Sequence, residues 1–84
     1  MSIEALNIDS HIGLRIRQRR LFLGLTRSEF ATSLGCATAQ LESFENGATQ
    51  ITAETLFDIA QGLGVEVMDF FQGASSYRSN ADSF

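Results

Sequence analysis

The stretch RSEFATSLGCATAQLESFEN, residues 27–46, decides the fold of this 84-residue chain. Apolar side chains recur in it at helical spacing on both sides of a glycine, namely Phe30, Ala31, Leu34, Leu41 and Phe44. Ala31 is small enough to let two helix backbones approach closely where they cross. Gly35 tolerates the positive φ that a tight corner needs, and Cys36 completes that corner. The stretch therefore predicts two short helices that cross at a sharp turn.

Two helices joined in this way form a helix-turn-helix, whose second helix is usually offered to the major groove of DNA. The start of the first helix is marked by Thr26 and Glu29, which have the T-x-x-E spacing of a capping box. We expect this helix to run from Arg27 to about Leu34, and the second from about Thr38 to Phe44.

The flanking segments also show helical patterns, and no strand pattern appears, so we predict an all-α fold. Asp9 or Ser10 can cap a helix that runs to about Leu23 and turns Ile12, Ile16 and Leu23 inward. Thr52 can cap a further helix that Gly62 or Gly64 closes, with Leu56, Ile59, Ala60 and Leu63 on its inner face.

A short, strongly apolar helix over residues 66–71 is predicted to be the fifth and last. Residues 1–8 read as a flexible N-terminal arm, residues 9–72 as the folded domain, and residues 73–84 as a disordered polar tail. At 84 residues the chain has room for one small core, and dimerisation would help to stabilise so small a domain.

Charge is distributed unevenly along the chain, which carries six arginines, no lysine and a net charge of −4. Residues 1–35 hold five arginines against three acidic residues, whereas residues 36–84 hold one arginine against seven acidic residues. Affinity for DNA depends strongly on phosphate neutralisation, so the acidic total argues against DNA binding, although a local basic face can suffice. Any such face must come from the N-terminal half.

Composition excludes several classes of protein. One cysteine allows neither an internal disulfide nor a cysteine-rich zinc site. The first ten residues lack the basic flank and apolar core of a signal peptide, and no apolar run approaches the length of a membrane span. We expect a soluble cytoplasmic protein, of bacterial type, that does not bind a membrane.

From residue 12 to residue 71 the chain resembles the Cro/CI (XRE-type) helix-turn-helix domain of phage repressors and small bacterial regulators. The stretches that carry the resemblance are IGLRIRQRRLFLGLTRSEFATSLG, LESFENG and ETLFDIAQGLGVEVMDFF, in that order. The resemblance implies a five-helix, lambda-repressor-like domain. It also implies a sequence-specific DNA-binding transcriptional regulator, most simply a homodimeric repressor on a palindromic operator.

The same resemblance implies roles for individual residues. Base edges would face Thr38, Ala39, Gln40 and Ser43 of the reading helix, and phosphates would contact Arg27, Arg20 and Arg17. Arg20 and Glu45 match a structural pair that ties the first helix to the third. Gln40 can pair bidentately with adenine, and Thr38 can touch a thymine methyl group; the plain alternative is a polar, solvated helix face.

The chain departs from the family pattern in its reading helix. Ala37 stands where the family usually has a capping Ser or Thr, although Thr38 could cap a helix that starts one residue later. The helix carries no Lys or Arg, and its charged residues are Glu42 and Glu45. These departures weaken the electrostatic case for DNA binding.

More apolar side chains gather near the C-terminus than one small core should hide. We expect some of Phe57, Met68, Phe70 and Phe71 to be core and the rest to form a two-fold dimer face, as similar regulators dimerise through their C-terminal helices.

The acidic C-terminal half supports a second hypothesis, a protein-interaction module on the same fold: an antirepressor, antiactivator or antitoxin-like partner of another regulatory protein. Nothing in the sequence indicates an enzyme or a small-molecule substrate, because no nucleophile, base and orienting residue can be assembled. His11 has no neighbouring ligand residues, so no metal and no cofactor are expected. Cys36 is best explained as a small core-facing residue, with redox sensing as a remote alternative.

Overall fold

Four α-helices and one 3₁₀ helix make up the described part of the chain. The computed structural model describes residues 3–73, with side chains from residue 8 onward. Its elements are α1 (Ile3–Phe22), α2 (Arg27–Leu34), α3 (Thr38–Glu45), α4 (Ala53–Leu63) and the 3₁₀ helix η1 (Val67–Phe71). No strand occurs within residues 3–73, which agrees with the predicted all-α class.

The fifth predicted helix is a 3₁₀ helix and not an α-helix. Gly64 ends α4 in the left-handed region, at φ 71°, and the chain turns before η1 begins at Val67. Five residues are too few to offset the cost of starting an α-helix, whereas 3₁₀ turns are common in pieces of this length.

The first helix differs from the prediction at both ends. It begins at Ile3 and not at Asp9 or Ser10, so residues 3–8 of the predicted arm are helical, and the predicted caps lie inside the helix. It ends at Phe22, and Leu23 is 41% exposed because the turn takes it out of the helical phase. Leu25 packs against the core instead. The predicted tail lies outside the described residues, except for Gly73.

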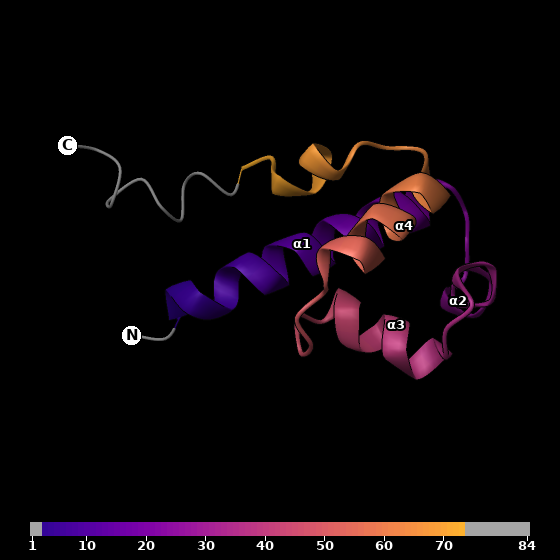
Figure 1. Ribbon diagram of the computed structural model, residues 1–84, viewed down its shortest axis with the longest axis horizontal. Helices are drawn as coiled ribbons and strands as arrows, with labels where there is room; N and C mark the ends of the chain where they lie inside the picture. Colours follow the sequence, from indigo (N-terminus) through magenta and orange to yellow (C-terminus); the bar gives the residue numbers. More distant parts are fainter. Residues whose placement is uncertain (1–2, 74–84) are drawn as a thin grey trace.

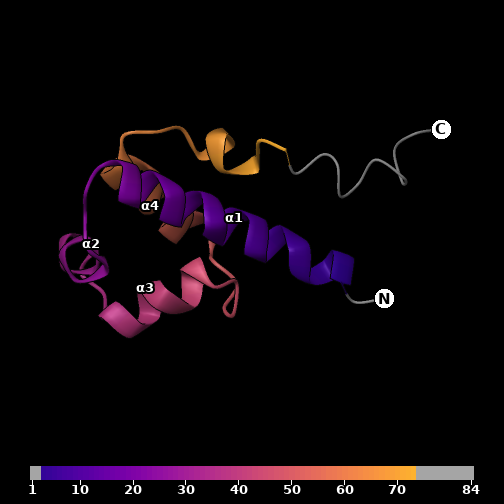
Figure 2. The same ribbon diagram turned by 180° about the vertical axis from the view of Figure 1, so that it is seen from behind.

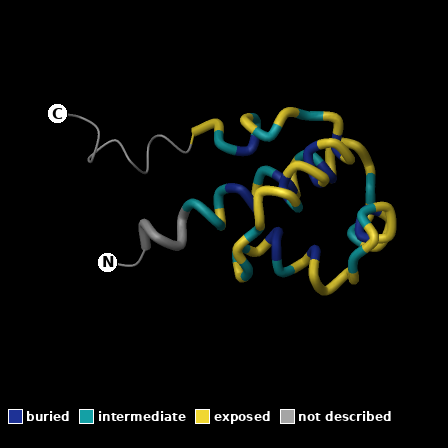
Figure 3. Tube along the Cα trace, viewed as in Figure 1, coloured by how far each residue is buried: buried dark blue, intermediate teal, exposed yellow. Residues whose placement is uncertain are grey.

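One apolar core joins all five elements. Its buried members are Ile12, Ile16, Phe30, Ala31, Leu41, Phe44, Leu56, Ile59, Ala60, Leu63 and Phe70. The inner faces predicted for α2, α3 and α4 are largely confirmed, although Leu34 is half-buried. Figure 3 shows the buried positions on the sides of the helices that face one another.

The elements are arranged on two sides of α1 and α4. In Figure 1, α3 lies below this pair and η1 lies above it, while α2 closes one end; Figure 2 shows the same order from behind. Accordingly, α1 contacts both α3 and η1, and α2 contacts α3 and α4.

Candidate nucleic-acid interface

The outward face of α3 carries the predicted reading residues. Thr38, Ala39 and Gln40 are exposed, whereas Leu41 and Phe44 pack into the core and hold the helix against the domain. Ser43 is half-buried, and its hydroxyl oxygen accepts a hydrogen bond at 3.0 Å from the Thr49 hydroxyl, which lies in the loop after α3. Three of the four predicted base-reading residues are thus exposed, and the fourth is hydrogen-bonded to the following loop.

Both ends of α2 are built as the sequence predicts. The Thr26 hydroxyl accepts from the Glu29 backbone N–H at 3.0 Å, and the Glu29 carboxylate accepts from the Thr26 N–H at 2.8 Å, which completes the capping box. Gly35 ends α2 at φ 77°, where a side chain would be strained. These two devices fix the direction in which the chain enters and leaves α2.

A buried carboxylate joins α1, α2 and α3. Glu45 has a fully buried side chain and accepts from Arg20 through two bonds, Nε to Oε2 at 2.6 Å and Nη2 to Oε1 at 3.0 Å. Arg27 Nε donates to the same Oε1 at 3.0 Å. Because charge-assisted bonds of this kind are directional, they set the position of α3 relative to α1 and to the start of α2.

Arg20 is therefore a structural residue and not a phosphate contact. It is 4% exposed, and its remaining Nη1 group donates to the Leu25 carbonyl oxygen at 2.7 Å. A side chain that is enclosed and has each guanidinium nitrogen hydrogen-bonded cannot reach a phosphate without breaking those bonds. The structure joins Arg20 and Glu45, the pair that the resemblance implies.

The other two predicted phosphate contacts remain accessible on the α3 side of the molecule. Arg27 opens α2 with a side chain that is 32% exposed despite its bond to Glu45. Arg17 is exposed and lies one helical turn after Gly13, a residue of α1 that packs against α3. The bond from Arg27 to Glu45 was not predicted, because sequence spacing alone does not show that the two helix ends meet.

The remaining arginines of α1 face η1. Arg15 Nη2 donates to the Gln72 side-chain oxygen at 3.4 Å, and Arg19 Nε donates to the Leu63 carbonyl oxygen at 3.1 Å. Arg19 also lies over the Phe22 ring, 5.2 Å from its centre. The four arginines of α1 are thus divided between two sides of the molecule, and among them only Arg17 adds exposed positive charge near α3.

The start of α3 lacks a side-chain cap. Ala37 occupies the N-cap position and has no side-chain oxygen to offer, and the helix begins at Thr38, so Thr38 does not take over the capping role. The structure therefore confirms that α3 lacks the side-chain cap that the family usually has at this position.

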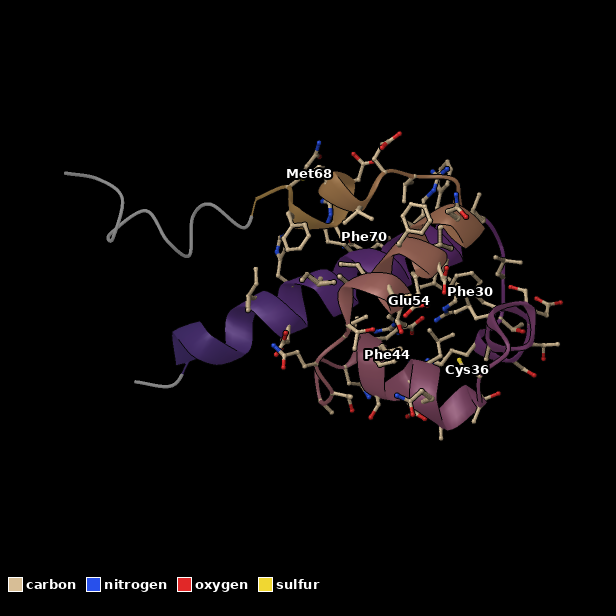
Figure 4. All side chains as sticks on the ribbon, in the orientation of Figure 1. Phe30, Cys36, Phe44, Glu54, Met68 and Phe70 are labelled. Atoms are coloured by element: carbon tan, nitrogen blue, oxygen red, sulfur yellow. The ribbon has the colours of Figure 1, made fainter. Side chains whose placement is uncertain are left out.

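The residues predicted to form a dimer face are dispersed. Phe70 is 2% exposed and belongs to the core, so it is one of the core members expected among these four residues and is not available to a dimer face. Phe71 is half-buried beside a groove of about 370 Å³, which also touches Ile8 and Ile51. Phe57 and Met68 are 52% and 73% exposed, and Figure 4 shows Met68 on the side of the molecule away from α3.

Two further predicted positions have structural roles. Cys36 is half-buried and packs against the core. His11 Nε2 lies 2.6 Å from the Gln72 carbonyl oxygen, to which it donates, and this bond ties α1 to the end of η1. Among the described residues, no cluster of His, Cys, Asp and Glu has the makings of a metal site. Within residues 3–73 no helix has both the length and the apolar character needed to cross a membrane.

Comparison with protein families gives a match over most of the folded domain. Residues 16–70 match a helix-turn-helix family model, HTH_3. A transcriptional regulator in the ATPase CF(0) region of Rhodospirillum rubrum is 38% identical over 65 residues, covering 77% of this chain and 60% of the relative. An HTH-type transcriptional regulator of Sinorhizobium medicae is 40% identical over 67 residues, covering 80% of this chain and 48% of the relative. The chain thus spans about half the length of the curated relatives it matches.

Solved structures agree in fold. The clp gene regulator ClgR from Corynebacterium glutamicum superposes with a TM-score of 0.76 at 25% identity, covering 82% of this chain and 90% of that chain. A transcriptional regulator of the HTH_3 family from Vibrio cholerae gives a TM-score of 0.73 at 29% identity, covering 81% of this chain and 38% of that chain.

Proposed function

The chain belongs to the HTH_3 helix-turn-helix family, and from that premise we propose that it is a sequence-specific DNA-binding regulator that reads the major groove with α3. The observation that carries the proposal is the outward face of α3. It presents Thr38, Ala39 and Gln40 to solvent while a buried carboxylate locks the helix to the rest of the domain. A rigidly held helix with exposed amide and hydroxyl groups can pair with base edges.

Phosphate binding rests on few groups in this proposal. Arg17 and Arg27 flank α3 and would each neutralise one phosphate, while Arg20 stays within the domain. Two copies on one operator would then give a slope of log K against log salt of about −4. We expect binding that is clearly salt-sensitive but weaker than that of regulators with basic reading helices.

We further propose that two copies act as a homodimeric repressor on a palindrome. Half-sites one helical turn apart, about 34 Å, require both α3 helices to face the same duplex, so the shared interface must lie beside α3 and not behind it. The groove of about 370 Å³ meets that condition, because it borders the α3–α4 loop through Gln50 and Ile51. Phe71 lines this groove, which makes it the predicted interface residue that best suits an operator dimer.

The phosphate role is tested with two variants of equal charge. Arg17→Ala and Arg15→Ala each remove one arginine from α1, but Arg17 lies toward α3 and Arg15 is bonded to Gln72 near η1. We expect Arg17→Ala to weaken binding to all duplexes alike and to lower the salt slope by about one per subunit. Arg15→Ala should leave the slope unchanged, and equal effects of the two variants would refute this orientation of the domain on DNA.

The base-reading role is tested by selection from random duplex DNA at low salt, about 50 mM. We expect an enriched palindrome, and we expect Gln40→Ala to lose the preference at one position in each half-site while Gln18→Ala keeps it. If no duplex binds even at low salt, DNA reading is excluded. The protein-partner alternative would then be favoured, and the acidic surface of α4, which includes Glu54 and Asp58, supports it.

A further inference from the structure

One side of α1 is left uncovered by the rest of the domain. In Figure 2, α1 lies in front of α4, and no other described element passes over it. Leu14 and Leu21 lie on this side, about two helical turns apart, and they are 49% and 54% exposed. Gln18 is exposed between them, and Phe22, which follows Leu21, is 77% exposed. We call the surface made of Leu14, Gln18, Leu21 and Phe22 the outer face of α1.

The spacing and shape of the outer face fit a second helix laid along it. Apolar side chains that recur every seven residues, as Leu14 and Leu21 do, are the pattern with which one helix packs along another. Beside Phe22 the surface is hollowed between α1 and η1 to a volume of about 380 Å³. A side chain of the second helix has room to enter this hollow while its neighbours rest against the two leucines.

Positive charge borders the outer face along both edges. On the edge toward α3, Arg17 is exposed and makes no hydrogen bond or ion pair with any other residue that the structure describes. On the edge toward η1, Arg15 and Arg19 line the hollow. No acidic residue occurs over residues 10–28. An occupant of the outer face therefore meets arginine on either side of its apolar contacts.

The nearby acidic groups do not cancel this charge. Asp69 lines the hollow, but its carboxylate accepts from the Glu66 backbone N–H at 3.1 Å and so serves η1. Glu54 and Asp58 are exposed on α4, a different helix. In a chain with a net charge of −4, an acidic partner is repelled by surfaces such as α4 and attracted to the outer face of α1.

We infer that the outer face of α1 binds an amphipathic helix of a partner protein, one whose apolar stripe is flanked by Asp and Glu. The stripe packs on Leu14 and Leu21, and the acidic flanks pair with Arg15 and Arg17. Burial of the leucines supplies affinity, whereas the ion pairs at the edges select the partner and speed its association. A basic helix with the same apolar stripe is rejected by the arginines.

Binding of this helix has a consequence for DNA that rests on the proposed function. Arg17 is both one edge of the outer face and a proposed phosphate contact. An acidic helix that pairs with Arg17 removes that phosphate contact and places negative charge beside the duplex. The partner therefore acts as an antagonist of operator binding.

The chemistry of the partner is tested with a displayed library of helical peptides, about 20 residues long, whose outward positions are random. Peptides are selected on the 84-residue chain and counter-selected on Leu14→Gln with Leu21→Gln. We expect enrichment of peptides that combine apolar residues at helical spacing with a net negative charge. No enrichment, or enrichment of neutral or basic peptides, would overturn the inference.

The enriched peptide is then titrated against matched double variants whose folding is checked by urea unfolding. Leu14→Gln with Leu21→Gln should weaken peptide binding at least about tenfold. Phe57→Gln with Met68→Gln also removes two exposed apolar side chains, but from α4 and η1, and should leave binding unchanged. Equal effects of the two pairs would contradict binding at the outer face. If the leucine pair instead dissociates an oligomer of the wild type in sedimentation, the occupant is a second copy and the inference fails.

Exchange of charge tests the acidic flanks separately. Arg15→Glu with Arg17→Glu should weaken binding of the enriched peptide at least about tenfold, and should bind more tightly than wild type to a version of the peptide with Lys in place of Asp and Glu. Wild-type protein that binds the two peptides equally would contradict the charge selection.

Competition with DNA is measured from the affinity for the selected duplex at about 50 mM salt, with and without saturating acidic peptide. We expect the peptide to weaken duplex binding by wild type at least about tenfold, and to leave binding by Leu14→Gln with Leu21→Gln unchanged. Simultaneous binding of peptide and duplex at full affinity would contradict competition for Arg17. Failure of the wild type to bind any duplex without peptide would refute the proposed function, while the titration would still decide whether the outer face binds an acidic helix.

Discussion

The two sides of α1 are held by different kinds of contact. On the side toward α3, the Gly13 backbone packs directly against the carbonyl groups of Phe44 and Glu45, and Glu45 is bonded to Arg20. On the side toward η1, the Phe70 ring is buried, whereas the hydrogen bond of Arg15 is exposed and that of Arg19 is partly buried. The contacts on the α3 side are close and directional, so they can hold a reading helix in an accurate position. The contacts on the η1 side are looser, so this side tolerates substitution and leaves apolar surface exposed.

The largest expected effect is the loss of the buried guanidinium on the α3 side. Arg20→Met leaves the Glu45 carboxylate buried with a single partner, and we expect the free energy of unfolding to fall by about 3–5 kcal/mol. Arg19→Met on the η1 side removes one partly enclosed hydrogen bond and a contact with Phe22, and should cost about 1 kcal/mol. Urea unfolding of both variants measures the difference, and similar losses would mean that the two sides do not differ as described.

Gly13→Ala should be next in size. A Cβ at Gly13 would collide with backbone carbonyl groups of α3, which cannot move without shifting the whole helix, and we expect a loss of about 2–3 kcal/mol. Gly62→Ala is the comparison, because its closest contact, at 2.8 Å, is a side-chain atom of the buried Phe30 ring and not a backbone atom, and because alanine favours the helix, so we expect a smaller loss. Thermal unfolding should show a clearly lower midpoint for Gly13→Ala than for Gly62→Ala.

Capping α3 should stabilise the protein. Ala37→Ser supplies the missing side-chain acceptor at the N-cap, and we expect a gain of about 1 kcal/mol in the free energy of unfolding. Thr52 already has that role in α4, where its hydroxyl accepts from the Thr55 N–H at 3.2 Å, so Thr52→Ala should lose a similar amount. If neither variant changed the free energy of unfolding, side-chain caps would contribute little to the stability of this domain.

The smallest effect is expected on the exposed part of the η1 side. Met68→Gln should change the free energy of unfolding by less than about 0.5 kcal/mol when the protein is dilute enough to be monomeric, because Met68 is 73% exposed. A loss above about 1 kcal/mol under those conditions would show that Met68 contributes to the monomer and not to an interface.

Much of the fold could be predicted because its signals are local. The capping box of Thr26 and Glu29, the corner glycine Gly35 and the apolar spacing of α4 each need only a few neighbouring residues to be recognised. The start of α1 could not be placed, because Asp9 and Ser10 favour an N-cap over a helix interior, whereas in the structure both lie inside the helix. In η1, apolar composition alone did not distinguish an α-helix from a 3₁₀ turn.

The candidate site was less predictable, because its roles depend on which elements meet. Arg17, Arg19 and Arg20 are close neighbours in sequence, yet one is exposed, one is bonded to the end of α4 and one is buried against α3. Similarly, Phe70 and Phe71 are adjacent, but only Phe70 enters the core fully. Helical phase can separate such residues only when the positions of the neighbouring helices are known.

One oxygen atom of Glu45 accepts from Arg20 of α1 and from Arg27 of α2, while Glu45 itself ends α3. Local opening of any one of these three helices breaks bonds made by the other two. We therefore expect the slowly exchanging backbone amides of α2 and α3 to exchange with solvent together, as one cooperative unit with the C-terminal half of α1. The amides of η1, outside this network, should exchange faster and at a separate rate, so hydrogen exchange would divide the molecule along the line between its two sides.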